Sequence, residues 1–216
     1  MVGSLIYLTS CTRPDLCFIV STLSQYLSKP TYAHLNLCKN VLRYLKGTLD
    51  YGLTFKPIGL IKIVGYSDAS WANAENRKSI SGFAYSLSDD ATLISWKSKK
   101  QPTVALSTCE SEYIAMTLAM QEGIFISQLL KDIGMCSGGE PVILYIDNKG
   151  AIDLAKNPVH HQRTKHVDIK YHFIRTKVQD GSFILKYVPS KSNIADLFTK
   201  PLPRTTITGF NIVSVC

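Results

Sequence analysis

The sequence predicts an α/β domain with a mixed sheet, in which an antiparallel meander comes first and parallel crossovers follow. Three observations lead to this fold class. Short strand-like runs crowd residues 60–98, and a long helical pattern covers residues 107–134. The run "VILYI" at 142–146 is continuously apolar, which is typical of a parallel strand covered by helices on both faces.

Helices are predicted before and after the meander. Residues 14–48 carry apolar side chains at roughly helical spacing in two stretches, which join at "SKP" and stop at a glycine. The long helix over 107–134 begins with Ser107 or Thr108 as its N-cap and ends at Gly134.

The strands follow from apolar runs that are bounded by turn residues. Asp89 and Asp90 predict a hairpin between the second strand and the third. In chain order, the predicted strands are 60–67, 79–88, 91–98, 142–146 and 182–188. The remaining helices are predicted at 148–156, 164–178 and 193–200.

The composition is that of a folded chain in a reducing, intracellular compartment. Hydrophobic residues make up 45% of the 216 residues, enough for one or two modest cores. No apolar run reaches the ~18 residues of a membrane span. The first basic residue is Arg13, so the start lacks the charged region of a secretory signal. The six cysteines show neither a CxxC pair nor metal-ligand spacing.

The net charge of +8 is unevenly distributed along the chain. Residues 1–60 carry 6 basic and 2 acidic residues, residues 61–155 carry 8 and 11, and residues 156–216 carry 10 and 3. An acidic middle beside a basic tail suits a polyanion bound near metal-holding carboxylates. Charge alone also fits a basic protein without such a partner.

Two aspartates are predicted at neighbouring strand ends. Asp68 follows the strand 60–67, and Asp147 follows the strand 142–146. Carboxyl ends of neighbouring parallel strands lie side by side, and sites form there in sheets of this kind. Either residue alone is explained by a turn or a helix cap. Together they predict a pair of carboxylates at one edge of the sheet.

A third carboxylate is expected from the start of the long helix, where Glu110 and Glu112 compete. Two positions on a helix are about 200° apart, so these two side chains cannot share a face. The residues below Glu112 are small or apolar: Ala115, Met116, Ala119, Gly123, Ile126 and Leu130. The residues below Glu110 are polar: Thr117, Gln121 and Gln128. Glu112 is therefore predicted to point inward, where a metal could compensate its charge. Glu110 is predicted to be a charge at the helix start that the helix dipole stabilises.

With these acids in this order, the chain resembles the ribonuclease H domain of copia-type retrotransposon polyproteins. The matching blocks cover residues 63–203 and include "YSDASWA", "RKSISGFAY", "ISWKSKKQPTVALSTCESEYIA", "YIDNKGAI", "RTKHVDIKYHFIR" and "KSNIADLFTKPL". Residues 1–56 resemble the end of the reverse transcriptase part of the same polyprotein.

The resemblance implies a ribonuclease H-like mixed five-stranded sheet with flanking helices, preceded by a small helical segment. It divides the chain into a helical reverse transcriptase remnant at 1–57, a ribonuclease H-like domain at 58–203 and an atypical tail at 204–216. The tail does not resemble the usual continuation of the family.

The family pattern also implies a fourth acid, Asp196 in "SNIAD", and a metal-dependent hydrolysis of the RNA strand of RNA–DNA hybrids. Mg²⁺, or Mn²⁺, suits carboxylate oxygens, and two ions can activate water and stabilise the leaving oxygen. By this resemblance Asp68 bridges the ions, and Asp196 holds one of them. Glu112 and Asp147 complete the other ion's site or position water.

The predicted substrate contact is the basic helix 164–178. The residues expected to meet phosphates are Arg163, Lys165, Lys170, Arg175 and Lys177, although a solvated helix face explains the same charges. The resemblance implies two partners, an RNA–DNA hybrid and an upstream reverse transcriptase domain, and no membrane. The expected location is the cytoplasm, in a virus-like particle, with the nucleus as an alternative.

Some features depart from the family pattern. No histidine precedes Asp196 in "KYVPSKSNIAD", and no Tyr-x-Asp-Asp polymerase signature is present, so DNA synthesis by this chain alone is not expected. An inactive relic that only binds nucleic acid remains the alternative function. A transposase or integrase core is disfavoured, because there the glutamate follows the second aspartate, whereas Glu112 precedes Asp147.

Overall fold

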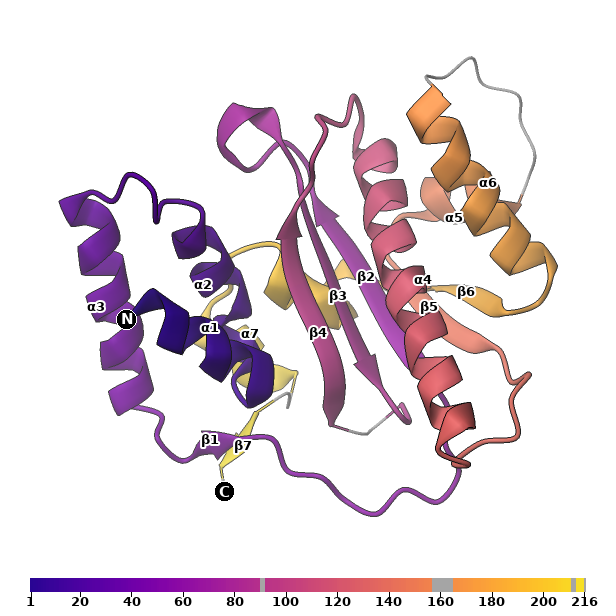
Figure 1. The fold of residues 1–216 in the computed structure, drawn as a ribbon, viewed down its shortest axis with the longest axis horizontal. Helices are drawn as coiled ribbons and strands as arrows, with labels where there is room; N and C mark the ends of the chain where they lie inside the picture. Colours follow the sequence, from indigo (N-terminus) through magenta and orange to yellow (C-terminus); the bar gives the residue numbers. More distant parts are fainter. Residues whose placement is uncertain (90–91, 157–164, 211–212, 216) are drawn as a thin grey trace.

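A mixed five-stranded sheet forms the centre of the molecule (Figure 1). The computed structural model describes residues 1–89, 92–156, 165–210 and 213–215. The strands of the sheet are β2 (Val64–Ser70), β3 (Ile80–Ser86), β4 (Leu93–Lys100), β5 (Val142–Ile146) and β6 (Phe183–Tyr187). Their order in space is β4-β3-β2-β5-β6. The first three run antiparallel, and β5 and β6 add in parallel, which confirms the predicted fold class.

Strand β2 differs from its prediction, because it begins at Val64 and continues past Asp68 to Ser70. On the β3 side, Asp68 pairs with Gly82 and the ladder goes on for two more pairs. On the β5 side, the pairing stops at Ser67, opposite Ile146. The prediction that Asp68 ends the strand is therefore wrong for the antiparallel edge, where β3 prolongs the ladder. On the parallel edge, Asp68 is the first residue beyond the pairing.

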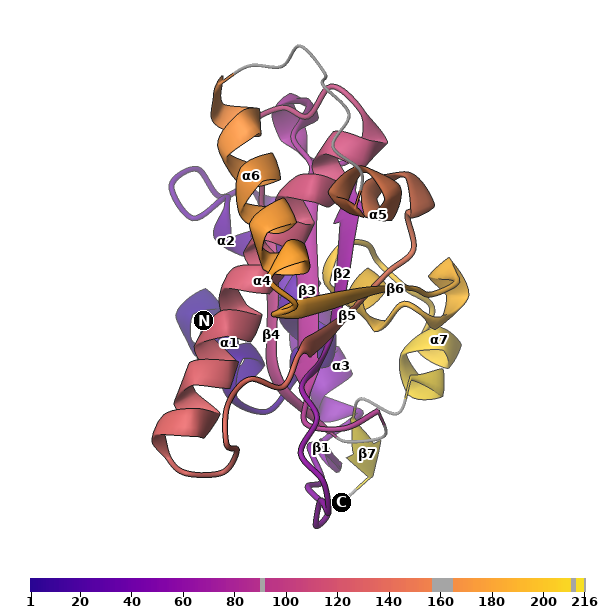
Figure 2. The ribbon, with the colours of Figure 1, turned by 90° about the vertical axis from the view of Figure 1, so that its right-hand side faces the viewer.

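The two faces of the sheet are covered by different elements (Figure 2). Helix α4 (Thr108–Asp132) packs on one face of β2 and β3, while the 3₁₀-helix η4 (Ile194–Phe198) packs on the opposite face of the same strands. The predicted start of α4 is confirmed at Ser107, whose hydroxyl accepts a hydrogen bond from the Glu110 N–H. After α4, Gly134 adopts a φ of +74°, which favours glycine.

Helices α5 (Lys149–Lys156) and α6 (Lys165–Gln179) pack on each other and on α4. The rings of Tyr113 and Tyr171 stack at 3.8 Å and fix α6 to α4. The main core lies between these helices and the sheet, and its largest side chains include Tyr85, Met116, Met120 and Phe183.

The N-terminal segment forms a second, smaller core around Leu16, Val20 and Val41. Its helices are α1 (Val2–Cys11), η1 (Pro14–Leu16), α2 (Cys17–Ser24) and α3 (Tyr32–Lys46). The apolar patterns alone do not predict α1, but the family resemblance implies a helical segment before the sheet, and α1 belongs to that segment. Hydrogen bonds join the segment to β4: the Trp96 indole donates to the Thr9 carbonyl at 2.7 Å, for example, and the Ser21 hydroxyl donates to the Ser98 carbonyl at 3.0 Å.

The last part of the chain returns toward the N-terminal segment (Figure 1). Strand β7 (Ser214–Val215) pairs antiparallel with β1 (Tyr51–Gly52). The short elements η2 (Glu75–Arg77), η3 (Ser190–Ser192) and α7 (Arg204–Gly209) complete the fold. Among the residues that the structure describes, no helix combines the length and apolar character needed to cross a membrane.

Candidate metal centre

The register of two parallel strands brings Asp68 and Asp147 to the same edge of the sheet. The last pair of the β2–β5 ladder joins Ser67 and Ile146. Asp68 and Asp147 are the residues that directly follow this pair in the sequence. Asp68 is held inside the sheet by its pairing with β3, and only 4% of its surface is exposed. Asp147 lies in the turn before α5 and is half-buried.

The third aspartate, Asp196, arrives from the opposite end of the sequence on η4. The Asn193 amide donates a hydrogen bond to the Ser67 carbonyl at 3.1 Å, which attaches the start of η4 to β2. The middle of η4 lies directly on Gly82, because a Cβ at this position would be 2.8 Å from the Cβ of Phe198 and 2.9 Å from the Ala195 carbonyl. A residue without a side chain on β3 therefore allows η4 to approach the sheet and bring Asp196 beside Asp68.

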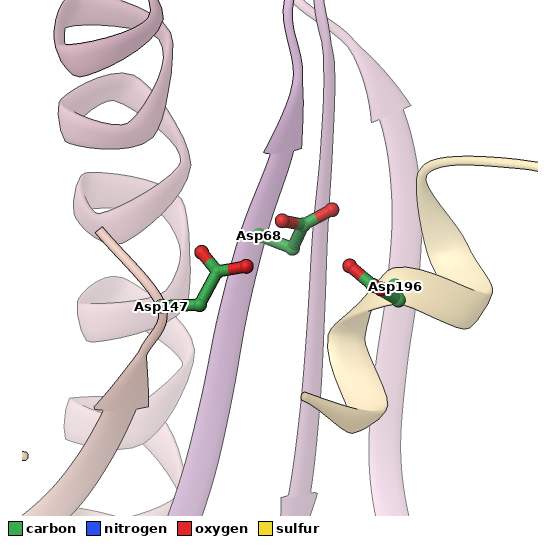
Figure 3. A group of neighbouring side chains, drawn as sticks. All are labelled: Asp68, Asp147 and Asp196. Atoms are coloured by element: carbon green, nitrogen blue, oxygen red, sulfur yellow. The ribbon is translucent and has the colours of Figure 1, made fainter. Parts of the chain in front are cut away.

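The three carboxylates point toward one another (Figure 3). Asp68, Asp147 and Asp196 each offer an oxygen, and these oxygens all lie within 4.8 Å of one another. Asp68 and Asp196 are buried, so water screens their mutual repulsion poorly. The arrangement is one that could bind cations.

The electrostatics of the cluster oppose ionisation of its members. Burial and the neighbouring Asp196 carboxylate raise the pKa of Asp68 to about 7. Burial also raises the pKa of Asp196, although the ammonium of Lys200 opposes the rise. Burial and the neighbouring carboxylates penalise the charged form, and a bound cation would remove that penalty.

Glu112 lies next to this triad but outside it. Its side chain is 6% exposed, and burial together with the charges of Asp68 and Asp147 holds its pKa well above the usual range. The Ala69 N–H donates a hydrogen bond to the Glu112 carboxylate, which favours the charged form. Glu110 is half-buried, and its carboxylate accepts a hydrogen bond from the Leu106 N–H at 2.8 Å. The prediction that Glu112 is the inward glutamate is confirmed, and Glu110 lies in the first turn of the helix as expected.

The polar face predicted below Glu110 is only partly exposed. Thr117 is buried, and its hydroxyl donates to the Tyr113 carbonyl at 2.9 Å. A backbone carbonyl four residues earlier in the helix accepts the hydrogen bond of this hydroxyl, so the polar side chain of Thr117 can be buried and does not indicate an exposed face.

The site residues fit a divalent ion by the chemistry of their donors. The three aspartates that could act as ligands all offer carboxylate oxygens, and hard ions such as Mg²⁺ prefer oxygen ligands. Asp196 Oδ1 and Glu112 Oε2 are buried and have no hydrogen-bond partner among the described residues. Buried oxygens in this state are costly unless a cation or water meets them.

Two residues that follow Asp196 also reach the cluster, and the sequence patterns did not single them out. The Lys200 ammonium lies 2.8 Å from Asp196 Oδ2, and the carboxylates raise its pKa although burial opposes the rise. The Thr199 hydroxyl donates a hydrogen bond to Asp68 Oδ2. Their spacing of three and four residues from Asp196 would put them on one side of a helix turn, which is a weak signal.

The predicted nucleic-acid contacts are spread along α6. Arg163 lies outside the described residues, as does the side chain of Lys165. Lys170 is near Glu110 at the site end of the molecule, and burial lowers its pKa. Lys177 forms an ion pair with Asp180 at 3.3 Å. It precedes the start of β6, which pairs with the start of β5 and so lies at the opposite end of the sheet from Asp147.

Arg175 lies between these two lysines on α6 and is half-buried. Its Nε has no hydrogen-bond partner among the described residues.

Comparison with known proteins gives relatives over nearly the whole chain. The retrovirus-related Pol polyprotein from transposon TNT 1-94 of Nicotiana tabacum is 42% identical over 204 residues, which are 94% of this chain and 15% of that protein. The retrovirus-related Pol polyprotein from transposon RE2 of Arabidopsis thaliana is 42% identical over 212 residues, which are 98% of this chain and 14% of that protein. The chain thus spans only a small part of the length of these relatives. No family model matches the chain.

Among solved structures, the foamy viral protease-reverse transcriptase in complex with an RNA/DNA hybrid shares the fold. The TM-score is 0.58 at 12% identity, over 94% of this chain and 26% of that chain.

The strand order and the carboxylates gathered where β2 and β5 part define a ribonuclease H-like domain. At 42% identity over nearly its full length, the chain belongs to the Pol polyproteins of copia-type retrotransposons, of which it spans one segment.

Proposed function

We propose that this chain is a metal-dependent endonuclease that hydrolyses the RNA strand of RNA–DNA hybrids. The observation that carries the proposal is the gathering of Asp68, Asp147 and Asp196 within 4.8 Å on a ribonuclease H-like sheet. A buried cluster of carboxylates that repel one another is costly, and a metal-binding role explains its presence, because a bound cation offsets the repulsion. Structural ion pairs do not explain the cluster, because Lys200 is the one cation that an ion pair ties to it among the described residues.

The residues that would hold Mg²⁺, or Mn²⁺, are Asp68, Asp147, Asp196 and Glu112. When bound, two such ions would supply activation of a water molecule and stabilisation of the leaving oxygen. The protein's own part is to hold the carboxylates in place: β2 and β5 fix two of them, η4 brings the third, and α4 presents Glu112. Burial of the cluster limits competition from water for these oxygens.

The proposed substrate is supported by charge and by the fold relative. The foamy viral protein was solved with an RNA/DNA hybrid. In this chain Lys170 lies at the site end of α6, close enough to Glu110 to feel its charge. We place the phosphate contacts at this end of α6, with Arg175 further along the helix.

The proposed setting is a retrotransposon polyprotein. Residues 1–57 would close the reverse transcriptase region, residues 58–203 would form the nuclease, and residues 204–216 would be a tail of unassigned role. The upstream reverse transcriptase domain is then a partner within the polyprotein, and the cytoplasm is the proposed location.

The test is cleavage of a hybrid whose RNA strand is end-labelled, with Mg²⁺ or with EDTA. The expected result is Mg²⁺-dependent cutting of RNA in the hybrid, and no cutting of the same RNA alone or of double-stranded DNA. The Asp68→Asn variant is the control for a contaminating nuclease. Binding of the hybrid without cleavage would instead support the inactive relic, and equal cleavage of double-stranded DNA would overturn the proposed specificity.

A further inference from the structure

Thr199 is fully buried beside the carboxylate cluster. It is the first residue after η4, and none of its surface is exposed. Its hydroxyl donates to Asp68 Oδ2, and its second acceptor, the Asp196 carbonyl, lies further away at 3.3 Å. A threonine hydroxyl has one proton to donate, so the closer acceptor, Asp68, takes it.

The methyl group of Thr199 determines which way the hydroxyl points. A Cβ on Gly82 would be 2.8 Å from Thr199 Cγ2, so the methyl occupies the space that a side chain on β3 would fill. A β-branched side chain has few allowed rotamers. With the methyl against Gly82, the hydroxyl is turned to Asp68, which pairs with Gly82 across the β2–β3 ladder.

The Thr199 hydroxyl therefore hydrogen-bonds to one oxygen of the Asp68 carboxylate, whose other near neighbours include like charges. Asp68 stands between Asp147 and Asp196, whose negative charges both act against its ionised form. A hydrogen bond to Oδ2 stabilises that ionised form and fixes the plane of the carboxylate. It leaves Oδ1 to meet a cation.

We propose that Thr199 is a positioning residue that holds the Asp68 carboxylate ready for a divalent ion. The proposal rests on the proposed metal centre. A purely structural role is the alternative: the methyl would pack η4 onto Gly82, and the hydroxyl would be incidental. The two roles assign the importance to different atoms of one side chain, so two substitutions separate them.

Thr199→Val keeps the branched shape and removes the hydroxyl, whereas Thr199→Ser keeps the hydroxyl and removes the methyl. The readout is Mg²⁺ affinity of the purified chain, measured by titration calorimetry and by the rise in melting temperature with Mg²⁺ concentration. Thr199→Val should weaken Mg²⁺ binding by about 10- to 100-fold, as is usual when a group that orients a metal ligand is removed. Thr199→Ser keeps the donor but loses the methyl that orients it, so it should lose less Mg²⁺ affinity than Thr199→Val.

The matched control is Thr117→Val. It also removes a buried threonine hydroxyl, but one that bonds to the Tyr113 carbonyl within α4. Its Mg²⁺ affinity should equal that of the wild type.

Wild-type Mg²⁺ affinity in Thr199→Val would overturn the proposal, and so would an equal loss in Thr199→Ser and Thr199→Val. The failure of the proposed function looks different. A wild-type chain that binds Mg²⁺ but does not cut the hybrid refutes the nuclease and leaves the Thr199 comparison decisive. A wild-type chain that does not bind Mg²⁺ overturns both.

Discussion

Asp68 makes the stability of the metal-free protein depend on pH. Its pKa is raised to about 7 in the folded chain from an ordinary value of 3.8. Between these two values the folded state binds more protons than the unfolded state, so the free energy of unfolding falls as pH rises. The loss is complete above about pH 7. The raised pKa values of Glu112 and Asp196 act in the same direction.

The Asp68→Asn variant should remove part of this pH dependence and also abolish cleavage. Ionising the buried carboxyl costs about 1.4 kcal/mol for each pH unit by which its pKa exceeds the ordinary value. We therefore expect the metal-free variant to be more stable than the wild type by on the order of 4 kcal/mol at about pH 8. Urea unfolding in EDTA at about pH 5 and about pH 8 measures the difference. An unchanged pH dependence would show that Asp68 ionises normally.

Glu112 and Glu110 form a natural matched pair on one helix. Glu112→Gln should reduce hybrid cleavage by roughly 100-fold, equivalent to about 2.7 kcal/mol of transition-state stabilisation. Glu110→Gln should leave turnover close to that of the wild type, because its carboxylate accepts the Leu106 N–H at the start of α4 and does not belong to the cluster. Steady-state turnover at saturating Mg²⁺ tests the ranking. The reverse ranking would move the candidate ligand to the outer face of the helix.

At the scale of elements, the sheet and the long helix could be predicted because their signals are local. "VILYI" is β5 to the residue, and the apolar stripe of α4 identified Glu112 as the inward glutamate. The position of Asp196 could not be predicted from spacing. Its place beside Asp68 depends on Asn193 bonding to a strand 126 residues away and on the missing side chain at Gly82. Only the family resemblance pointed to Asp196, since η4 is too short to carry a periodic pattern.

Gly82→Ala tests how η4 is seated. The added Cβ would meet Phe198, Thr199 and Ala195 at 2.8–2.9 Å, and one of these contacts is a backbone carbonyl that cannot rotate away. We expect a loss of about 1–3 kcal/mol in the free energy of unfolding, together with weaker Mg²⁺ binding.

The control for this substitution is Gly3→Ala in α1. A Cβ there meets nothing within 4 Å, and alanine favours a helix, so stability should hold or rise slightly. A Gly82→Ala variant as stable as the wild type, with unchanged Mg²⁺ affinity, would mean that η4 can shift without cost.

For the whole molecule, the salt dependence of hybrid binding tests which end of α6 meets the substrate. Removing one side chain that neutralises a phosphate should reduce the slope of log affinity against log salt by about 0.7–0.9. We expect this reduction for Lys170→Ala, because Lys170 lies near Glu110 at the start of α4. Lys177→Ala should leave the slope unchanged, because Lys177 pairs with Asp180 at the far end of the sheet. Equal slopes for both variants and the wild type would mean that these basic residues of α6 form a solvated helix face and do not contact phosphates.

The contact between the N-terminal helices and β4 has a consequence for solubility. β4 is an outer strand of the sheet, and the free side of such a strand can recruit a second chain by continuing the ladder, which is a route to aggregation. The Ser21 hydroxyl already occupies the Ser98 carbonyl, and Lys97 and Lys99 put exposed charges along the same strand. The N-terminal helices thus protect the unpaired edge of β4 from pairing with the sheet of a second molecule.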